Sequence, residues 1–173
     1  MNEYYLTCPR GLEDITCLDI STYLDTPPTP DKGGVFFNGS LKDMYTVNMY
    51  SRTGMFVLEK LYFLEANNYN ELYEKIFEYP WQNIIGSKKT FSIRSKINSE
   101  IYTNPNFTTL KIKDGIVDSI KDKLGARPSI DRYNPDIKFF IFINNNKIKI
   151  YMDSSGSPLF MRGYRTKIHK AAL

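Results

Sequence analysis

The chain has 173 residues, of which 42% are hydrophobic and 24% charged, and its net charge is +4. These values are ordinary for a soluble globular protein, so they argue against a disordered or fibrous chain. No apolar run approaches the roughly 18 residues that a membrane-spanning helix needs, and the first residues lack the blocks of a secretory signal. We therefore expect no membrane attachment and a cytoplasmic location.

The charge is divided unevenly along the chain. Residues 1–86 carry six Lys and Arg against twelve Asp and Glu, whereas residues 87–173 carry seventeen against seven. A strongly basic half is typical of proteins that bind polyanions such as nucleic acid, through phosphate contacts and counterion release. A surface that is merely solvated by lysines explains the same composition, and charge alone does not separate the two explanations.

Residues 1–66 predict a β-α-β-α-β unit. Strands are expected at residues 3–7, 35–37 and 55–64, with a helix that begins near Pro9 and another that follows Ser40 as N-cap. Three prolines make residues 25–30 a loop. The apolar stripes predicted for the helices are Leu12, Ile15, Leu18 and Tyr23 or Leu24 in the first, and Leu41, Met44, Tyr45, Val47 and Met49 in the second.

The rest of the chain predicts a second α/β unit. We expect helices at residues 71–79 and 106–124, a strand at 90–97, and a hairpin of strands 138–143 and 147–152. Leu110, Ile116 or Val117, Ile120 and Leu124 would form the stripe of the long helix. Trp81 is expected to be a core plug between the units. Gly115 in mid-helix costs about 0.5–1 kcal/mol relative to Ala; either another element or a ligand approaches closely there, or the cost is tolerated.

No catalytic constellation is visible. The only histidine is His169, so Ser-His-Asp, Cys-His and multi-histidine metal sites are unsupported. The acids Glu13, Asp14, Asp131, Asp136 and Asp153 are more simply caps, turn residues and salt-bridge partners. Cys8 and Cys17 fit no zinc or redox spacing and are expected to be two buried thiols. We therefore expect no catalytic residue, metal or cofactor in this chain.

What remains is a set of basic residues interleaved with aromatics, which could grip a phosphate backbone and stack a base. In the strand at 90–97, Arg94 and Lys96 fall on the side opposite Phe91, Ile93, Ser95 and Ile97. The whole set is Lys88, Lys89, Arg94, Lys96, Lys111, Lys113, Arg162, Tyr164, Arg165 and Lys167. Tyr164 between two arginines could equally anchor a terminal segment onto the core.

Several ordered motifs resemble a known family. They are residues 91–95, 113–118, 127–131, 134–137, 153–156 and 162–165. Together they are similar to a THUMP domain, and most closely to the THUMP-containing N-terminal half of bacterial guanine-N2 methyltransferases of 23S ribosomal RNA. Residues 7–13 and Ser51-Arg52 resemble the ferredoxin-like lead-in of the same proteins.

The resemblance implies an α+β fold: a ferredoxin-like unit at residues 1–66, packed with a THUMP RNA-binding unit at 67–165. Residues 166–173 would begin a linker to a methyltransferase domain that uses S-adenosylmethionine and is absent here. The expected partner is a 23S ribosomal RNA stem-loop, which this region would bind and position for the parent enzyme. We expect a monomer, and no cofactor in this fragment.

The residues expected to bind RNA are Arg94, Lys96, Lys111, Lys113, Arg162 and Arg165, with Tyr164 as a stacking residue. Two alternatives stay open. The parent could be a transfer-RNA methyltransferase or a thiouridine synthase, which also carry THUMP domains. The chain could instead be a ferredoxin-like module that binds a protein or a small molecule through its acidic first half.

Overall fold

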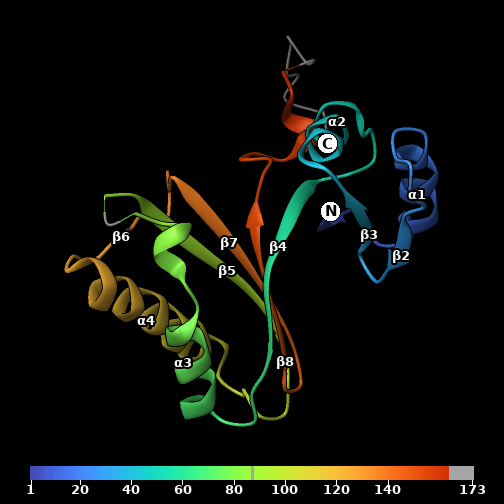
Figure 1. Ribbon diagram of the computed structural model, residues 1–173. Coiled ribbons are helices and arrows are strands. Elements are labelled where there is room, and N and C mark those ends of the chain that lie inside the picture. The colour runs from blue at the N-terminus through green and yellow to red at the C-terminus, as the bar shows by residue number, and fades with distance from the viewer. Residues whose placement is uncertain (87, 164–173) are drawn as a thin grey trace, which may run out of the picture. The chain divides into compact units, whose positions relative to one another are not determined.

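The computed structural model describes residues 1–86 and 88–163 (Figure 1). It confirms the α+β class and divides into two compact units. The first unit consists of residues 1–59 together with the segment that begins at Ser154, and the second of residues Lys60–Asp153. The second unit is therefore continuous in sequence, whereas the first is completed by residues that follow the second.

The first unit contains the predicted strands and helices and one additional strand. Its elements are β1 (Asn2–Thr7), α1 (Glu13–Ser21), β2 (Thr29–Asp31), β3 (Gly34–Gly39), α2 (Leu41–Tyr50), the start of β4 (Phe56–Glu65) and the short helix η2 (Leu159–Met161). The strands lie in the order β2-β3-β1-β4, and neighbours are antiparallel. Part of the expected loop at 25–30 thus belongs to β2. Pro30 is tolerated there because β2 is the edge strand.

The apolar stripes predicted for the two helices of this unit are wrong in part. In α2 the capping box of Ser40 and Asp43 fixes the predicted start, and Met44 and Val47 are buried. Leu41, Tyr45 and Met49 are exposed instead. In α1, Ile15 and Leu18 are exposed, while Thr16, Asp19 and Ile20 are buried. The buried side of α1 is partly polar because Asp19 holds a neighbouring loop, and hydropathy alone could not indicate that.

The segment from Ser154 to Arg162 is joined to the first unit by backbone and side-chain hydrogen bonds. Ser154 N donates to Val57 O at 3.0 Å, and Leu159 N donates to Met55 O at 2.8 Å. The Leu159 side chain is buried in the core of the first unit. The structure therefore groups this segment with the first unit, whereas the sequence placed it at the end of the second.

The second unit contains the end of β4, α3 (Tyr69–Glu78), the short helix η1 (Trp81–Asn83), β5 (Thr90–Asn98), α4 (Pro105–Leu124), β6 (Ser129–Ile130), β7 (Ile137–Asn144) and β8 (Lys147–Asp153). Its strands lie in the order β4-β8-β7-β5-β6. The predicted hairpin of β7 and β8 is confirmed. Asn145 turns it with a positive φ, as tight hairpin turns require. β5 is parallel to β7, with α4 between them in the chain.

Helices α3 and α4 pack side by side on one face of this sheet (Figure 1). Ser95 of β5 and Thr109 of α4 share a hydrogen bond of 2.6 Å, which fixes the side on which α4 lies. The expected stripe of α4 is rotated: Ile112, Ile116 and Ile120 are buried, while Leu110 and Leu124 are about half exposed.

Gly115 and Trp81 both belong to this packing. A Cβ atom at Gly115 would lie 2.8 Å from Ile76 Cγ2, so α3 approaches α4 closely at this residue, which is one of the three explanations that the sequence left open. Trp81 is fully buried in the core of the second unit, and its indole N–H donates to Ile76 O at 2.6 Å. Trp81 is thus a core residue of one unit, and this corrects its prediction as a plug between the two.

Candidate nucleic-acid interface

Strand β5 presents its two predicted cations on the sheet face that the helices leave open. Arg94 and Lys96 are exposed, and they alternate with Ile93 and Ser95, which face α4. The Arg94 guanidinium lies over the Phe140 ring at 5.8 Å from its centroid. This cation–π contact is within the usual range, and it orients the guanidinium on the sheet.

The register of the sheet adds further cations to this face. Ser92 pairs with Lys138, Arg94 with Phe140, and Lys96 with Phe142. In the hairpin, Phe142 pairs with Lys149, and Asn144 with Lys147. Because directly paired residues point to the same side, one sheet face carries a set that we name the basic sheet face: Arg94, Lys96, Lys138, Phe140, Phe142, Lys147 and Lys149.

Three lysines of this face, Lys138, Lys147 and Lys149, were not predicted from the sequence. The alternation that found Arg94 and Lys96 continues through both strands of the hairpin, so the same period-two pattern could have found them. Lys147 also lies 4.0 Å from Glu65. Both side chains are largely exposed, so this ion pair holds the lysine only weakly.

The lysines predicted on α4 lie elsewhere and are engaged within the protein. Lys113 Nζ is 2.6 Å from a carboxylate oxygen of Asp114. Lys111 Nζ lies over the Tyr73 ring, 4.8 Å from its centroid. Because α4 covers one face of the sheet and Arg94 and Lys96 lie on the other, the four residues do not form a single patch.

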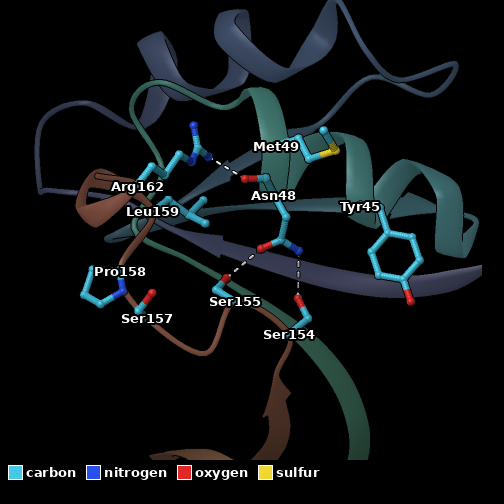
Figure 2. A pocket seen from close by; sticks show the side chains of 9 residues that line it. All are labelled: Tyr45, Asn48, Met49, Ser154, Ser155, Ser157, Pro158, Leu159 and Arg162. Atoms are coloured by element: carbon cyan, nitrogen blue, oxygen red, sulfur yellow. Dashed lines mark hydrogen bonds between the residues drawn. The ribbon is translucent and has the colours of Figure 1, made fainter. Parts of the chain in front are cut away.

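Arg162 belongs to the first unit. Its Nη2 donates to the main-chain oxygen of Asn48 in the last turn of α2 (Figure 2). The other two predicted residues, Tyr164 and Arg165, lie outside the described residues.

The Arg162 side chain borders a shallow cavity of about 470 Å³ whose polar groups bind one another. As Figure 2 shows, the Asn48 amide donates to Ser154 Oγ at 3.0 Å and accepts from Ser155 Oγ at 2.8 Å. Val57 N donates to Ser155 Oγ at 2.8 Å. Ser154 and Ser155, part of the motif set on which the resemblance rests, thus hold the returning segment in place. These contacts give the motif a structural role.

Three of the acids discussed from the sequence, Glu13, Asp131 and Asp136, accept hydrogen bonds as caps or turn residues. Glu13 accepts from the N–H groups of Gly11 and Gly33, and Asp136 accepts from Thr90 N and Oγ1. Hydrogen bonds from backbone N–H groups lower the pKa of Glu13, Asp131 and Asp136. Each carboxylate is therefore ionised near neutral pH and already holds its donors.

The two thiols have no activating environment. Burial raises the pKa of both Cys8 and Cys17, and a nucleophilic cysteine needs the opposite shift. Within residues 1–86 and 88–163, no cluster of His, Cys, Asp and Glu could hold a metal ion. Over the same residues, no helix is both long and apolar enough to cross a membrane.

Two family descriptions match the chain. The THUMP domain matches residues 66–153, which is just over half of the chain, and the RlmL ferredoxin-like domain matches residues 3–58. The chain belongs to the THUMP domain family. The THUMP match begins directly after β4 and stops at the last residue of β8, so the whole basic sheet face lies within it.

Relatives of this THUMP protein are longer. The ribosomal RNA large subunit methyltransferase K/L of Acinetobacter baylyi is 34% identical over 172 residues, and the match covers 95% of this chain but 23% of the relative. Among solved structures, a predicted N6-adenine-specific DNA methylase from Listeria monocytogenes has a TM-score of 0.84 at 22% identity, covering 99% of this chain and 45% of that one. A possible methylase from Clostridium difficile has a TM-score of 0.81 at 25% identity, and the match covers 96% of this chain and 44% of that one.

Proposed function

We propose that this chain is the RNA-binding and substrate-positioning region of a large-subunit ribosomal RNA guanine-N2 methyltransferase. The observation that carries the proposal is the match of almost the whole chain to ribosomal RNA large subunit methyltransferases K/L, over a region that contains a THUMP domain. The rest of the parent protein would supply the methyl-transfer chemistry and bind S-adenosylmethionine. This region would hold the RNA.

The basic sheet face supports this role physically. Five cations and two phenylalanines share one face of three neighbouring strands, which suits phosphate contacts together with stacking of unpaired bases. The protein would recognise the ribosomal RNA stem-loop chiefly by its shape and its phosphates. Lys111, Lys113, Arg162, Tyr164 and Arg165 remain proposed contacts. Lys111 and Lys113 would make contacts separate from this face, because α4 lies on the other side of the sheet.

The test is binding of the 173-residue chain to large-subunit ribosomal RNA hairpins and to transfer RNA across a salt series. We expect preference for the ribosomal hairpins and a log-log slope of about −0.7 to −0.9 per phosphate contact. The variant Arg94→Gln/Lys96→Gln should weaken binding to all RNAs similarly. The slope of log affinity against log salt concentration should become shallower by the equivalent of about two phosphate contacts.

The matched control is Lys121→Gln/Lys123→Gln, which removes the same charge from exposed residues at the end of α4. If this control weakens binding as much as the Arg94→Gln/Lys96→Gln variant, the sheet face is not the binding site. Tighter binding of transfer RNA would assign the chain to a transfer-RNA-modifying parent. Absence of salt-dependent affinity for either RNA would overturn the proposed function.

A further inference from the structure

A second cavity of about 200 Å³ in the first unit is bordered by two arginines. Arg52 comes from the loop between α2 and β4, and Arg162 follows η2 near the end of the described chain. Ser51, Gly54, Leu159 and Phe160 complete its wall. Two arginines from segments that are far apart in sequence thus line one small cavity.

The Arg52 side is held by a buried carboxylate. Asp19 accepts from Arg52 N at 2.7 Å, from Ser51 Oγ at 3.0 Å, and from Thr53 N and Oγ1. Burial alone would raise the pKa of Asp19, but these hydrogen bonds together hold it below its ordinary value, so the group is ionised at neutral pH. Its other oxygen lies 3.4 Å from Arg52 Nε.

This arrangement fixes the base of the Arg52 guanidinium and leaves its end for a ligand. The Arg52 side chain is 80% exposed, and within the described chain only its Nε makes a hydrogen bond. A guanidinium presents a rigid fork of donors, so anchoring at Nε aims the two Nη groups outward.

The Arg162 side is held in a similar way. One nitrogen, Nη2, donates to Asn48 O at the C-terminal end of α2, where a helix favours a cation. Leu159, three residues earlier, is anchored in the core. The remaining Arg162 donors make no hydrogen bond to the described residues, and the neighbouring Phe160 ring is 65% exposed.

We propose that Arg52 and Arg162 together bind one phosphate group of the RNA, with Phe160 available to stack on an adjacent unpaired base. Paired guanidinium forks match phosphate oxygens in geometry and charge. The contact of Arg52 Nε with the buried Asp19 at 3.4 Å favours one direction of the guanidinium, which reduces the side-chain entropy lost on binding. This inference rests on the proposed RNA-binding function, but it places a contact in the first unit, outside the basic sheet face.

The experiment is the salt series with the preferred RNA hairpin, applied to Arg52→Gln, Arg162→Gln and the double variant. Each single variant should weaken binding about three- to tenfold at physiological salt, and the slope should fall by up to about one contact, roughly 0.7–0.9. The double variant should lose little more than one contact, because both side chains hold the same phosphate. The control is Arg10→Gln, an exposed arginine of the same unit outside this cavity.

The Arg52→Lys variant separates a binding defect from a folding defect, because it keeps the charge and removes the forked guanidinium donors. It should bind RNA less well than the wild type and have the same melting temperature. In the wild type, the Nε–H resonance of Arg52 should shift on addition of RNA and, at higher concentration, of inorganic phosphate. The phosphate site is overturned if the variants behave as Arg10→Gln does while Arg94→Gln/Lys96→Gln still weakens binding. If the slope of the double variant falls by two full contacts, Arg52 and Arg162 do not bind the same phosphate. Absence of any RNA binding would overturn both this site and the proposed function.

Discussion

The two units use their charged side chains in different ways. In the first unit three acids are engaged internally: Asp19, Glu13 and Asp43 each accept backbone N–H groups, and hydrogen bonds hold the pKa of each below its usual value. In the second unit five cations share the basic sheet face, while other cations lie on α4. Three acids of the first unit thus hold donors of the protein itself, while the cations of the basic sheet face point to one side of the sheet.

The two units also differ in how their cores are closed. The second unit has a large core built from residues contiguous in sequence, whereas the core of the first includes Leu159. The only tryptophan, Trp81, lies in the second unit, so its fluorescence reports on that unit alone, while far-UV circular dichroism reports on both. Variants placed in one unit or the other can therefore test whether the two cores are independent.

The largest effect is expected in the second unit, from Trp81→Ala. Removing this fully buried side chain leaves a cavity and an unbonded Ile76 carbonyl. The free energy of unfolding should fall by about 3–5 kcal/mol. Urea unfolding followed by circular dichroism measures this change. Tyr133→Ala is the control, since that ring is 98% exposed. A loss below about 1 kcal/mol would contradict the core role of Trp81.

The next effect belongs to the first unit, from Asp19→Asn. An amide cannot accept all the bonds that the carboxylate accepts from Ser51, Arg52 and Thr53. The free energy of unfolding should therefore fall by about 1–3 kcal/mol. Because the two cores are separate, the midpoint seen by Trp81 fluorescence should move less than the midpoint seen by circular dichroism. Equal shifts in both signals would show that the units unfold as one.

Asp19 also makes stability depend on pH. Its pKa is lowered in the folded protein, so the unfolded chain takes up the proton at the higher pH. The stabilisation is complete above the ordinary value of 3.8 and is lost as the pH falls through the lower folded value. Urea midpoints measured from neutral pH down through this range should show the loss in the wild type and a smaller one in Asp19→Asn.

Ser155→Ala should have a somewhat smaller effect. It removes the acceptor of Val57 N and the donor to the Asn48 side chain. The expected loss is about 1–2 kcal/mol of the free energy of unfolding, measured by urea unfolding. The control is Ser157→Ala, at an exposed serine of the same segment. It should change stability by less than about 0.5 kcal/mol. Similar losses from both serines would mean that the bonds of Ser155 do not hold the segment.

The smallest effect is expected from Gly115→Ala, at about 1 kcal/mol of destabilisation. The new Cβ atom would lie 2.8 Å from Ile76 Cγ2, and Ile76 is fully buried. This clash outweighs the gain in helix propensity. In an Ile76→Ala background the same substitution should cost less or become stabilising. A thermal-melting cycle over the four proteins measures this coupling.

Local signals predicted much of the fold. Ser40 and Asn104 marked the starts of α2 and α4 because a side-chain oxygen can accept from the first free N–H groups. The three asparagines at 144–146, between two runs rich in Ile, Phe and Tyr, predicted the hairpin of β7 and β8. β2 was not predicted, because a strand that contains Pro30 forms only where a partner is available at a sheet edge.

Long-range contacts explain most of what could not be predicted. The bonds that return Ser154 and Ser155 to Val57 join residues about a hundred positions apart, and no local pattern encodes them. For the candidate site, alternation placed Arg94 and Lys96 correctly on one side of β5. Lys111 and Lys113 could not share that surface, since the side of the sheet on which α4 packs is set by tertiary contacts such as Ser95 with Thr109.

Because the chain returns to the first unit at Ser154, the two units are expected to complete their folding at different times during synthesis. A protein emerges from the ribosome N-terminus first, and its parts fold as their residues become available. The second unit is complete once β8 has emerged, whereas the first must wait for Leu159 to close its core. Of the two units described, the one that begins at the N-terminus is thus expected to complete its core later than the THUMP unit.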